Sequence, residues 1–103
     1  MSQEAIKENV VEVLRTVYDP EIPVNIYDLG LIYAIDVDDE AHVSIEMTLT
    51  SPNCPEAQTL PIKVEQTALA AEGVKTSRVT IVWDPPWTMD TMSEAAKLEL
   101  GLL

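Results

Sequence analysis

The sequence has only one cysteine, Cys54, and only one histidine, His42, among its 103 residues. One cysteine excludes a disulfide within the chain, and without a Cys-x-x-Cys or His-x-x-x-His pair a structural zinc site is not expected. Basic residues are also few: six stand against eighteen acidic residues, which gives a formal net charge of -12 at pH 7. Nucleic acid and anionic membranes are therefore not expected as partners, since both favour a basic surface.

Long hydrophobic runs are missing too. No stretch of about eighteen apolar residues occurs, and the N-terminal residues show no basic region followed by an apolar segment. We therefore expect a soluble, cytoplasmic protein without a membrane partner. The 103 residues, 47% of them hydrophobic, fit a single domain with one core that spans residues 1–103.

Apolar residues at helical spacing predict three helices. The first is opened by Ser2 and ends near Thr16, and the second lies between residues 57 and 72. Pro61 removes a backbone donor within the second helix, so we expect a kink or a restart there. A Thr-x-x-Glu capping box that begins at Thr91 opens the third helix.

Alternating apolar residues predict three strands. Residues 31–37 and 43–49 are separated by a short polar turn, which predicts a hairpin, and residues 79–83 form a third strand that places Trp83 in the core. A helix lies between the second and third strands, which favours a parallel pairing of those two. The order α-β-β-α-β-α predicts a small two-layer α+β domain, with a three-stranded mixed sheet covered by helices on one face.

Cys54 stands where the second predicted strand gives way to a helix. A helix start offers unpaired N–H groups and a positive dipole end, both of which favour thiolate over thiol. A reactive thiol and a small buried hydrophobic side chain are both compatible with this position. The residues alone leave the choice between them open.

Four segments, in this order, resemble the SufT and PaaD-like family of small iron–sulfur cluster assembly proteins. They are Asp19–Val24, Asp28–Tyr33, Thr48–Pro55 and Trp83–Thr88. The resemblance implies a compact α+β fold and a role in maturing or delivering iron–sulfur clusters. It also implies that the family cysteine falls on Cys54. The chain departs from the family pattern at two positions, Asn53 in place of a common glycine and Met89 in place of a common proline.

The number of thiolates limits what one chain can bind. An iron–sulfur cluster usually needs about four protein ligands, mostly cysteine thiolates, and one chain supplies only Cys54. A monomer is therefore not expected to hold a stable cluster, although it could bind a cluster or iron transiently. A homodimer would contribute two thiolates, and an apo-client or a small thiol could supply the remaining ligands.

Several residues of these segments are further candidates for contacts with cargo or partner. Thr50 and Asn53 precede the cysteine, and Asp19, Glu21 and Asp28 belong to a proline-containing loop and the turn after it. The carboxylates could contact a metal or a partner, or simply cap backbone N–H groups at turns. Trp87 follows two prolines and could anchor a partner or cover the core. We expect positive φ at Gly30 and a solvated position for His42, remote from Cys54.

Three functions are compatible with these observations. We favour a non-catalytic assembly factor that uses Cys54 to deliver clusters to apo-clients, together with scaffold or carrier proteins. An accessory subunit of a multicomponent oxygenase is the alternative that the PaaD-like side of the resemblance implies. A thiol enzyme is the third, but it lacks an evident base and a second cysteine.

Overall fold

The computed structural model describes residues 1–19, 22–50 and 59–101. In chain order, its helices and strands are α1 (Gln3–Leu14), β1 (Ile32–Val37), β2 (His42–Met47), α2 (Leu60–Leu69), β3 (Thr76–Ile81), the 3-10 helix η2 (Met89–Thr91) and α3 (Glu94–Glu99). The predicted order α-β-β-α-β-α is therefore confirmed. No helix within the described ranges is both long and apolar enough to cross a membrane.

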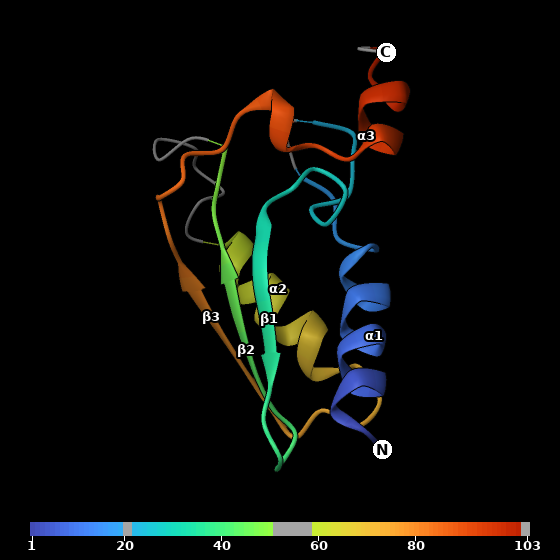
Figure 1. Ribbon diagram of the computed structural model, residues 1–103, viewed down its shortest axis with the longest axis vertical. Coiled ribbons are helices and arrows are strands. Elements are labelled where there is room, and N and C mark those ends of the chain that lie inside the picture. The colour runs from blue at the N-terminus through green and yellow to red at the C-terminus, as the bar shows by residue number, and fades with distance from the viewer. Residues whose placement is uncertain (20–21, 51–58, 102–103) are drawn as a thin grey trace.

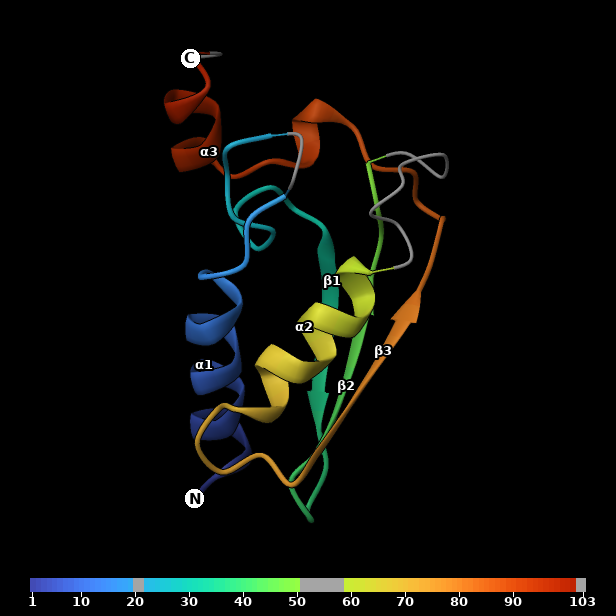
Figure 2. The same ribbon diagram turned by 180° about the vertical axis from the view of Figure 1, so that it is seen from behind.

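The sheet has the order β1-β2-β3, with β1 antiparallel to β2 and β2 parallel to β3. This arrangement confirms the predicted hairpin and parallel crossover. A bulge at Tyr33, between Ile32 and Ala34, interrupts the β1–β2 register. Helix α2 crosses one face of the sheet, and α1 stands beside β1 (Figures 1 and 2). The two-layer prediction is thus also correct.

The core lies between the helices and the covered face of the sheet. Helix α1 contributes the stripe that its sequence predicts, at Ile6, Val10 and Leu14. On β2 the side chains of Val43, Ile45 and Met47 are buried while those between them are exposed. The period of the apolar residues therefore decides which face of each element is covered. The largest fully buried hydrophobic side chains are Leu14, Ile26, Leu29, Leu31, Ile45, Met47, Val10, Val17, Val24, Val43 and Val64.

Two helix starts follow the predicted chemistry. Ser2 caps α1, and its hydroxyl accepts a hydrogen bond from Ala5 N–H at 3.1 Å. Pro61 lies in the first turn of α2, where its missing N–H leaves no helical bond unmade. The proline therefore marks the beginning of a helix and does not kink the middle of one.

The predicted start of the last helix is wrong. Helix α3 begins at Glu94, and the cap is Ser93, whose hydroxyl accepts from Ala96 N–H at 3.1 Å. Thr91 instead belongs to η2, where Thr88 and Thr91 form the capping box. Both positions carry a hydroxyl, and the chain path before α3 determines which of them is used.

The third strand also begins and ends earlier than predicted. It spans Thr76–Ile81, so Trp83 lies beyond it and is 49% exposed. The prediction that Trp83 belongs to the core is therefore wrong. Val79 and Ile81 follow the predicted alternation and both pack against the core. Trp83 lies beyond the end of the strand, where the two-residue period no longer determines which way a side chain points.

Candidate functional site

Three described segments meet at the end of the sheet toward which β2 and β3 run. They are the chain between α1 and β1, residues 48–50 after β2, and residues 82–93 after β3 (Figures 1 and 2). Main-chain bonds join them: Thr48 N–H donates to Leu31 at 2.8 Å, and Ser93 N–H donates to Asp28 at 2.8 Å. Loops at the carboxyl ends of parallel strands commonly carry binding sites, which makes this end the candidate site.

The cysteine of the sequence prediction lies in the connection that follows this end. Cys54 and Asn53 fall between Thr50 and the start of α2, outside the described residues. Glu21 also lies outside them. The described residues that flank these positions in the chain are Asp19 and Ile22 on either side of Glu21, and Thr50 and Thr59 on either side of the segment that holds Cys54.

Asp19 lies inside the loop between α1 and β1. Its side chain is 8% exposed, and its Oδ1 accepts a hydrogen bond from Ile22 N–H at 3.0 Å. The loop is held across its base, because Ile26 N–H donates to Val17 at 2.8 Å and Asp19 N–H donates to Val24 at 3.2 Å. These contacts match the turn-capping role that was one of the two alternatives for Asp19.

Asp28 forms a reciprocal pair with Asn25. The Asn25 side chain donates from Nδ2 to Asp28 Oδ2 at 2.8 Å, and its Oδ1 accepts from Asp28 N–H at 2.9 Å. Gly30 follows with φ +85°, which confirms the predicted positive φ. The carboxylate of Asp28 therefore helps to set the turn that leads into β1.

Trp87 ties the segment after β3 to the loop before β1. Its indole Nε1–H donates to the main-chain carbonyl of Leu29 at 2.7 Å, and the half-buried ring packs against the core. Close by in the chain, the hydroxyl of Tyr33 donates to the carbonyl of Pro85 at 2.7 Å. These contacts make Trp87 a cover for the core, and its polar atom is engaged within the fold.

Thr48 is a site residue that the sequence reasoning missed. Its side chain is fully buried, and Oγ1 has no hydrogen-bond partner among the described residues. Burying an unpaired hydroxyl costs about 1–3 kcal/mol, so such groups are rare without a reason. No signal in the sequence marked it, because Thr48 stands as the polar residue between Met47 and Leu49 in an alternating strand, and only the structure shows all three to be buried.

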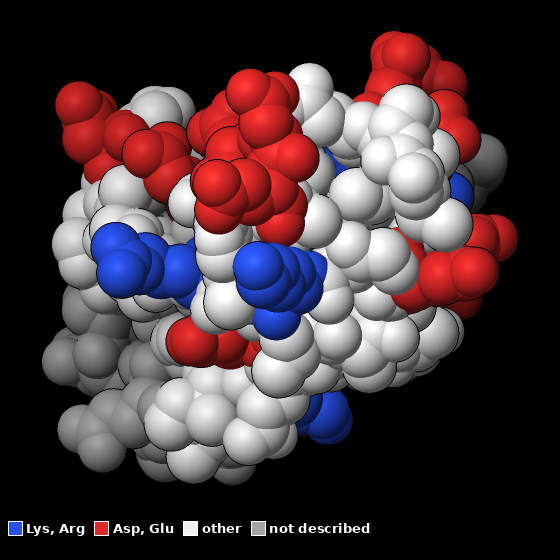
Figure 3. Space-filling view, turned by 90° about the horizontal axis from the view of Figure 1, so that it is seen from below, with Lys and Arg blue, Asp and Glu red and all other residues white. Residues whose placement is uncertain are grey.

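His42 lies at the other end of β2 from the candidate site, while its predicted distance from Cys54 concerns a residue outside the described ranges. It begins β2, where its Nδ1 meets the Thr76 hydroxyl and its Nε2 lies 3.4 Å from Glu40 Oε2. This is the end of the molecule that holds the N-terminus and the β1–β2 turn, where acidic side chains gather on the surface (Figure 3). In that turn the main-chain N–H of His42, and then that of Glu40, hold the pKa of Asp38 below its ordinary value.

The structure therefore brings four predicted residues to one end of the sheet: Asp19, Asp28, Thr50 and Trp87. Among the residues that the structure describes, no three histidine, cysteine, aspartate or glutamate side chains are grouped closely enough to hold a metal ion. The carboxylates of Asp19 and Asp28 accept hydrogen bonds from the fold itself.

Comparison with known proteins gives consistent matches over most of the chain. Residues 7–81 match a family described as "Iron-sulfur cluster assembly protein". A protein of Porphyromonas gingivalis named "Fe-S protein maturation auxiliary factor" is 50% identical over 97 residues, which cover 94% of this chain and 92% of that protein. The "Fe-S protein maturation auxiliary factor SufT" of Staphylococcus aureus is 42% identical over 86 residues, covering 84% of this chain and 98% of that protein.

A solved structure supports the same relationship. The crystal structure of a Bacillus anthracis domain of unknown function, DUF59, superposes with a TM-score of 0.90 at 38% identity and covers 100% of this chain and 98% of that one. Its agreement extends over the whole order of helices and strands. The segments quoted for the resemblance therefore belong to a shared fold and are not isolated motifs.

Proposed function

The chain belongs to the iron–sulfur cluster assembly protein family, and from this premise we propose that it is an auxiliary maturation factor that passes clusters to apo-clients through Cys54. The relatives named as Fe-S protein maturation auxiliary factors support this role, because they align along most of their own length. In this proposal the cluster or iron is cargo. It is received from a scaffold or carrier protein and passed to an apo-client.

The observation that carries the proposal is the position of the single thiol in the chain. Cys54 follows β2 in a segment that resembles the family motif, and the strand end before it is anchored through Thr48 and Leu31. A thiolate is the usual protein ligand of iron–sulfur clusters, and about four ligands are needed. One thiol favours a labile complex, which a second copy or a client completes and which releases its cargo readily.

We propose a non-catalytic role. A thiol enzyme would need a base beside the thiol, and the only histidine, His42, lies at the β1–β2 turn, at the other end of β2 from the segment that leads to Cys54. The word "auxiliary" in the names of the relatives also supports an accessory role. The transfer of a cluster between thiolates needs ligand exchange alone and no bond-making step by an acid or base of this chain.

The test compares Cys54→Ser with the natural chain, since serine preserves the volume but is a poor ligand for iron. Asn53→Gly is the matched control, because it changes the neighbouring residue to the one common in the family. Each protein is expressed in cells that lack the natural copy, and the activity of an iron–sulfur enzyme such as aconitase is measured together with the abundance of the variant. The purified proteins are also incubated anaerobically with iron and sulfide and analysed by absorption spectroscopy and sizing.

We expect Cys54→Ser to lower client activity severalfold at unchanged abundance, while Asn53→Gly retains activity. Cysteine-dependent cluster uptake by the purified protein would identify a carrier. If uptake is absent while the cellular defect is present, the cysteine works only inside a complex with a partner. Normal client activity with Cys54→Ser would refute the proposed role of the thiol.

A further inference from the structure

Strand β1 leaves one of its edges free. It is the outer strand of the sheet and pairs only with β2 among the described residues. The main-chain N–H of Asp38 donates to the carbonyl of His42, so Asp38 and His42 form a hydrogen-bonded pair across the two strands. Along an antiparallel ladder, such pairs alternate with pairs that are not hydrogen-bonded to each other. The non-bonded pairs are then Val37 with Val43 and Ile35 with Ile45. The N–H and C=O groups of Ile35 and Val37 therefore point away from β2, toward the free edge.

A groove runs beside this edge, between β1 and α1. Three adjoining hollows share residues along it, and Lys7 lines all of them. Tyr27 and Val11 line its first part, and Ile35 lines the other two, so the hollows form one continuous surface. The two hollows that β1 lines have volumes of about 160 and 370 Å³, and the third, of about 420 Å³, extends the groove along α1 and Tyr27 beyond the strand.

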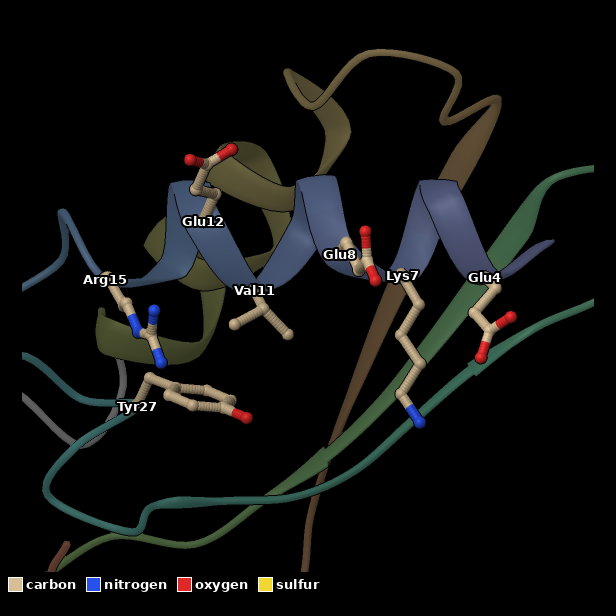
Figure 4. A pocket seen from close by; sticks show the side chains of 7 residues that line it. All are labelled: Glu4, Lys7, Glu8, Val11, Glu12, Arg15 and Tyr27. Atoms are coloured by element: carbon tan, nitrogen blue, oxygen red, sulfur yellow. The ribbon is translucent and has the colours of Figure 1, made fainter. Parts of the chain in front are cut away.

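The charges that line the groove are not paired with one another. Figure 4 shows Lys7 extending from α1 toward the strands and Arg15 lying over Tyr27, with 5.0 Å from the guanidinium carbon to the ring centre. Within the described part of the chain, neither cation has a carboxylate within 4.0 Å. The acidic lining residues outnumber these two cations; they are Glu4, Glu8, Glu12 and Asp36. The groove is therefore polar at its rim, apolar at Val11 and Ile35, and net acidic.

We propose that the α1–β1 groove binds an extended, basic segment of a partner protein, which adds to the free edge of β1 as a further strand. Strand addition supplies main-chain hydrogen bonds to Ile35 and Val37, and side chains on alternate positions contact α1. The excess of carboxylates in the groove and the net charge of -12 favour lysine or arginine on the incoming segment.

A second copy of the chain fits the edge poorly. Pairing β1 with β1 would bring Asp36 of both copies close together and would join two molecules of net charge -12. Like charges opposed across a strand pair are destabilising. The bulge at Tyr33 also shortens the regular edge, which suits a short segment better than a long strand. A short basic segment avoids both difficulties.

The test uses an alternating lysine–valine hexapeptide with blocked ends, titrated into the isotope-labelled protein and followed by NMR. We expect saturable shifts at the amides of Ile35 and Val37. An alternating glutamate–valine hexapeptide should bind at least tenfold more weakly, and so should a lysine–valine peptide with a central proline. Failure of the lysine–valine peptide to bind would overturn the proposal, as would shifts confined to the acidic β1–β2 turn, which indicate unspecific attraction.

Substitutions on β1 and α1 test whether the peptide binds in the groove between them. Val37→Pro removes the outward N–H, and Val37→Ala removes a similar part of the side chain but keeps that donor. We expect at least tenfold weaker binding for the proline variant relative to the alanine variant. Lys7→Trp fills the groove from α1 without changing β1 and should also weaken binding, whereas Lys63→Trp on α2 should not. Equal binding by Lys7→Trp and Lys63→Trp would contradict the proposal even if Val37→Pro did not fold.

Two controls separate this proposal from others. Cys54→Ser should bind the peptide as the natural chain does, so that a failure of the proposed cluster transfer leaves the groove unaffected. Measuring the molecular size at rising protein concentrations tests whether a second copy of the chain binds the β1 edge. Concentration-dependent dimers with shifts at Ile35 and Val37, in the absence of peptide binding, would assign the edge to self-association and refute the partner segment.

Discussion

The indole N–H of Trp87 donates to the main-chain carbonyl of Leu29 at 2.7 Å, across 58 positions of sequence. Leu29 is fully buried, so this bond fastens the segment after β3 to the loop that leads into β1. Both segments lie at the candidate-site end of the sheet, where β2 ends and the chain continues toward Cys54. Trp87, which follows two prolines and for which the sequence left a partner anchor and a cover for the core as alternatives, thus holds two segments of the candidate site together.

Trp87→Phe should lower the stability of the domain. Phenylalanine keeps most of the ring but has no donor for the Leu29 carbonyl, so we expect the free energy of unfolding to fall by about 1–2 kcal/mol. Trp83→Phe is the control, because Trp83 is 49% exposed and should change stability by no more than about 0.5 kcal/mol. Urea unfolding measures both, and equal effects would contradict the assigned role of the indole bond.

Gly30 should not tolerate a side chain. Its φ is +85°, and a Cβ atom there would clash with the carbonyl oxygen of Thr91. We expect Gly30→Val to lower the free energy of unfolding by at least about 2 kcal/mol, because the strained backbone and the clash add together.

Gly101 provides the matched comparison for Gly30. It has φ +76°, but no described atom lies within 4 Å of a Cβ built there. Gly101→Val should therefore cost only the backbone strain, about 1–2 kcal/mol. A similar loss of stability for both variants in urea unfolding would mean that the contact with Thr91 relaxes easily.

Local patterns in the sequence were enough for most of the fold. The stripe at Ile6, Val10 and Leu14 and the alternation at Val43 and Ile45 both depend on the geometry of a single helix or strand. Each of these two patterns identifies the buried face of its helix or strand without any information about what packs against that face. The parallel pairing of β2 with β3 followed in the same way, because a helix lies between them in the chain.

The error at the start of α3 arose because two nearby residues suit a helix cap equally well, and a tertiary contact decides which of them is used. Thr91 and Ser93 both suit a helix cap, and the use of Ser93 depends on its main-chain bond to Asp28, a residue far away in the sequence. The bond from Trp87 to Leu29 is equally non-local. The family motifs include segments that the structure brings together at one end of the sheet, but hydrogen bonds between distant segments cannot be read from spacing.

The β1–β2 turn should weaken in acid through Asp38. Its Oδ1 accepts from His42 N–H at 2.9 Å and from Glu40 N–H at 2.8 Å, and the first of these is the main cause of its lowered pKa. A carboxyl whose pKa is lower in the folded state stabilises the fold above its unfolded pKa. That contribution is lost as the pH falls below about 3.8 toward the folded value.

Asp38→Asn tests this relationship. We expect the natural chain to be more stable than the variant at pH 7, and the difference to shrink as the pH falls below about 3.8. Asp39→Asn removes a charge from the same turn but leaves both main-chain bonds to Asp38 in place, so it controls for charge alone. Urea midpoints at pH 7, 4 and 3 provide the measurement, and a constant difference between Asp38→Asn and the natural chain would contradict the argument.

Thr48 offers a test that separates stability from function. Its hydroxyl is fully buried and has no partner among the described residues, so the fold bears the cost of removing it from water. Valine has nearly the same shape without the hydroxyl. Thr48→Val should therefore leave the free energy of unfolding unchanged or raise it by up to about 3 kcal/mol.

Thr48→Ser is the opposite change, since it keeps the hydroxyl and removes the methyl group, and it should lower the free energy of unfolding by about 1 kcal/mol. If the hydroxyl is retained for cluster transfer, Thr48→Val will lower the activity of iron–sulfur clients in cells although the protein is at least as stable. A less stable Thr48→Val would show that the hydroxyl does have a stabilising partner. Full client activity with a more stable Thr48→Val would instead show that the hydroxyl takes no part in maturation.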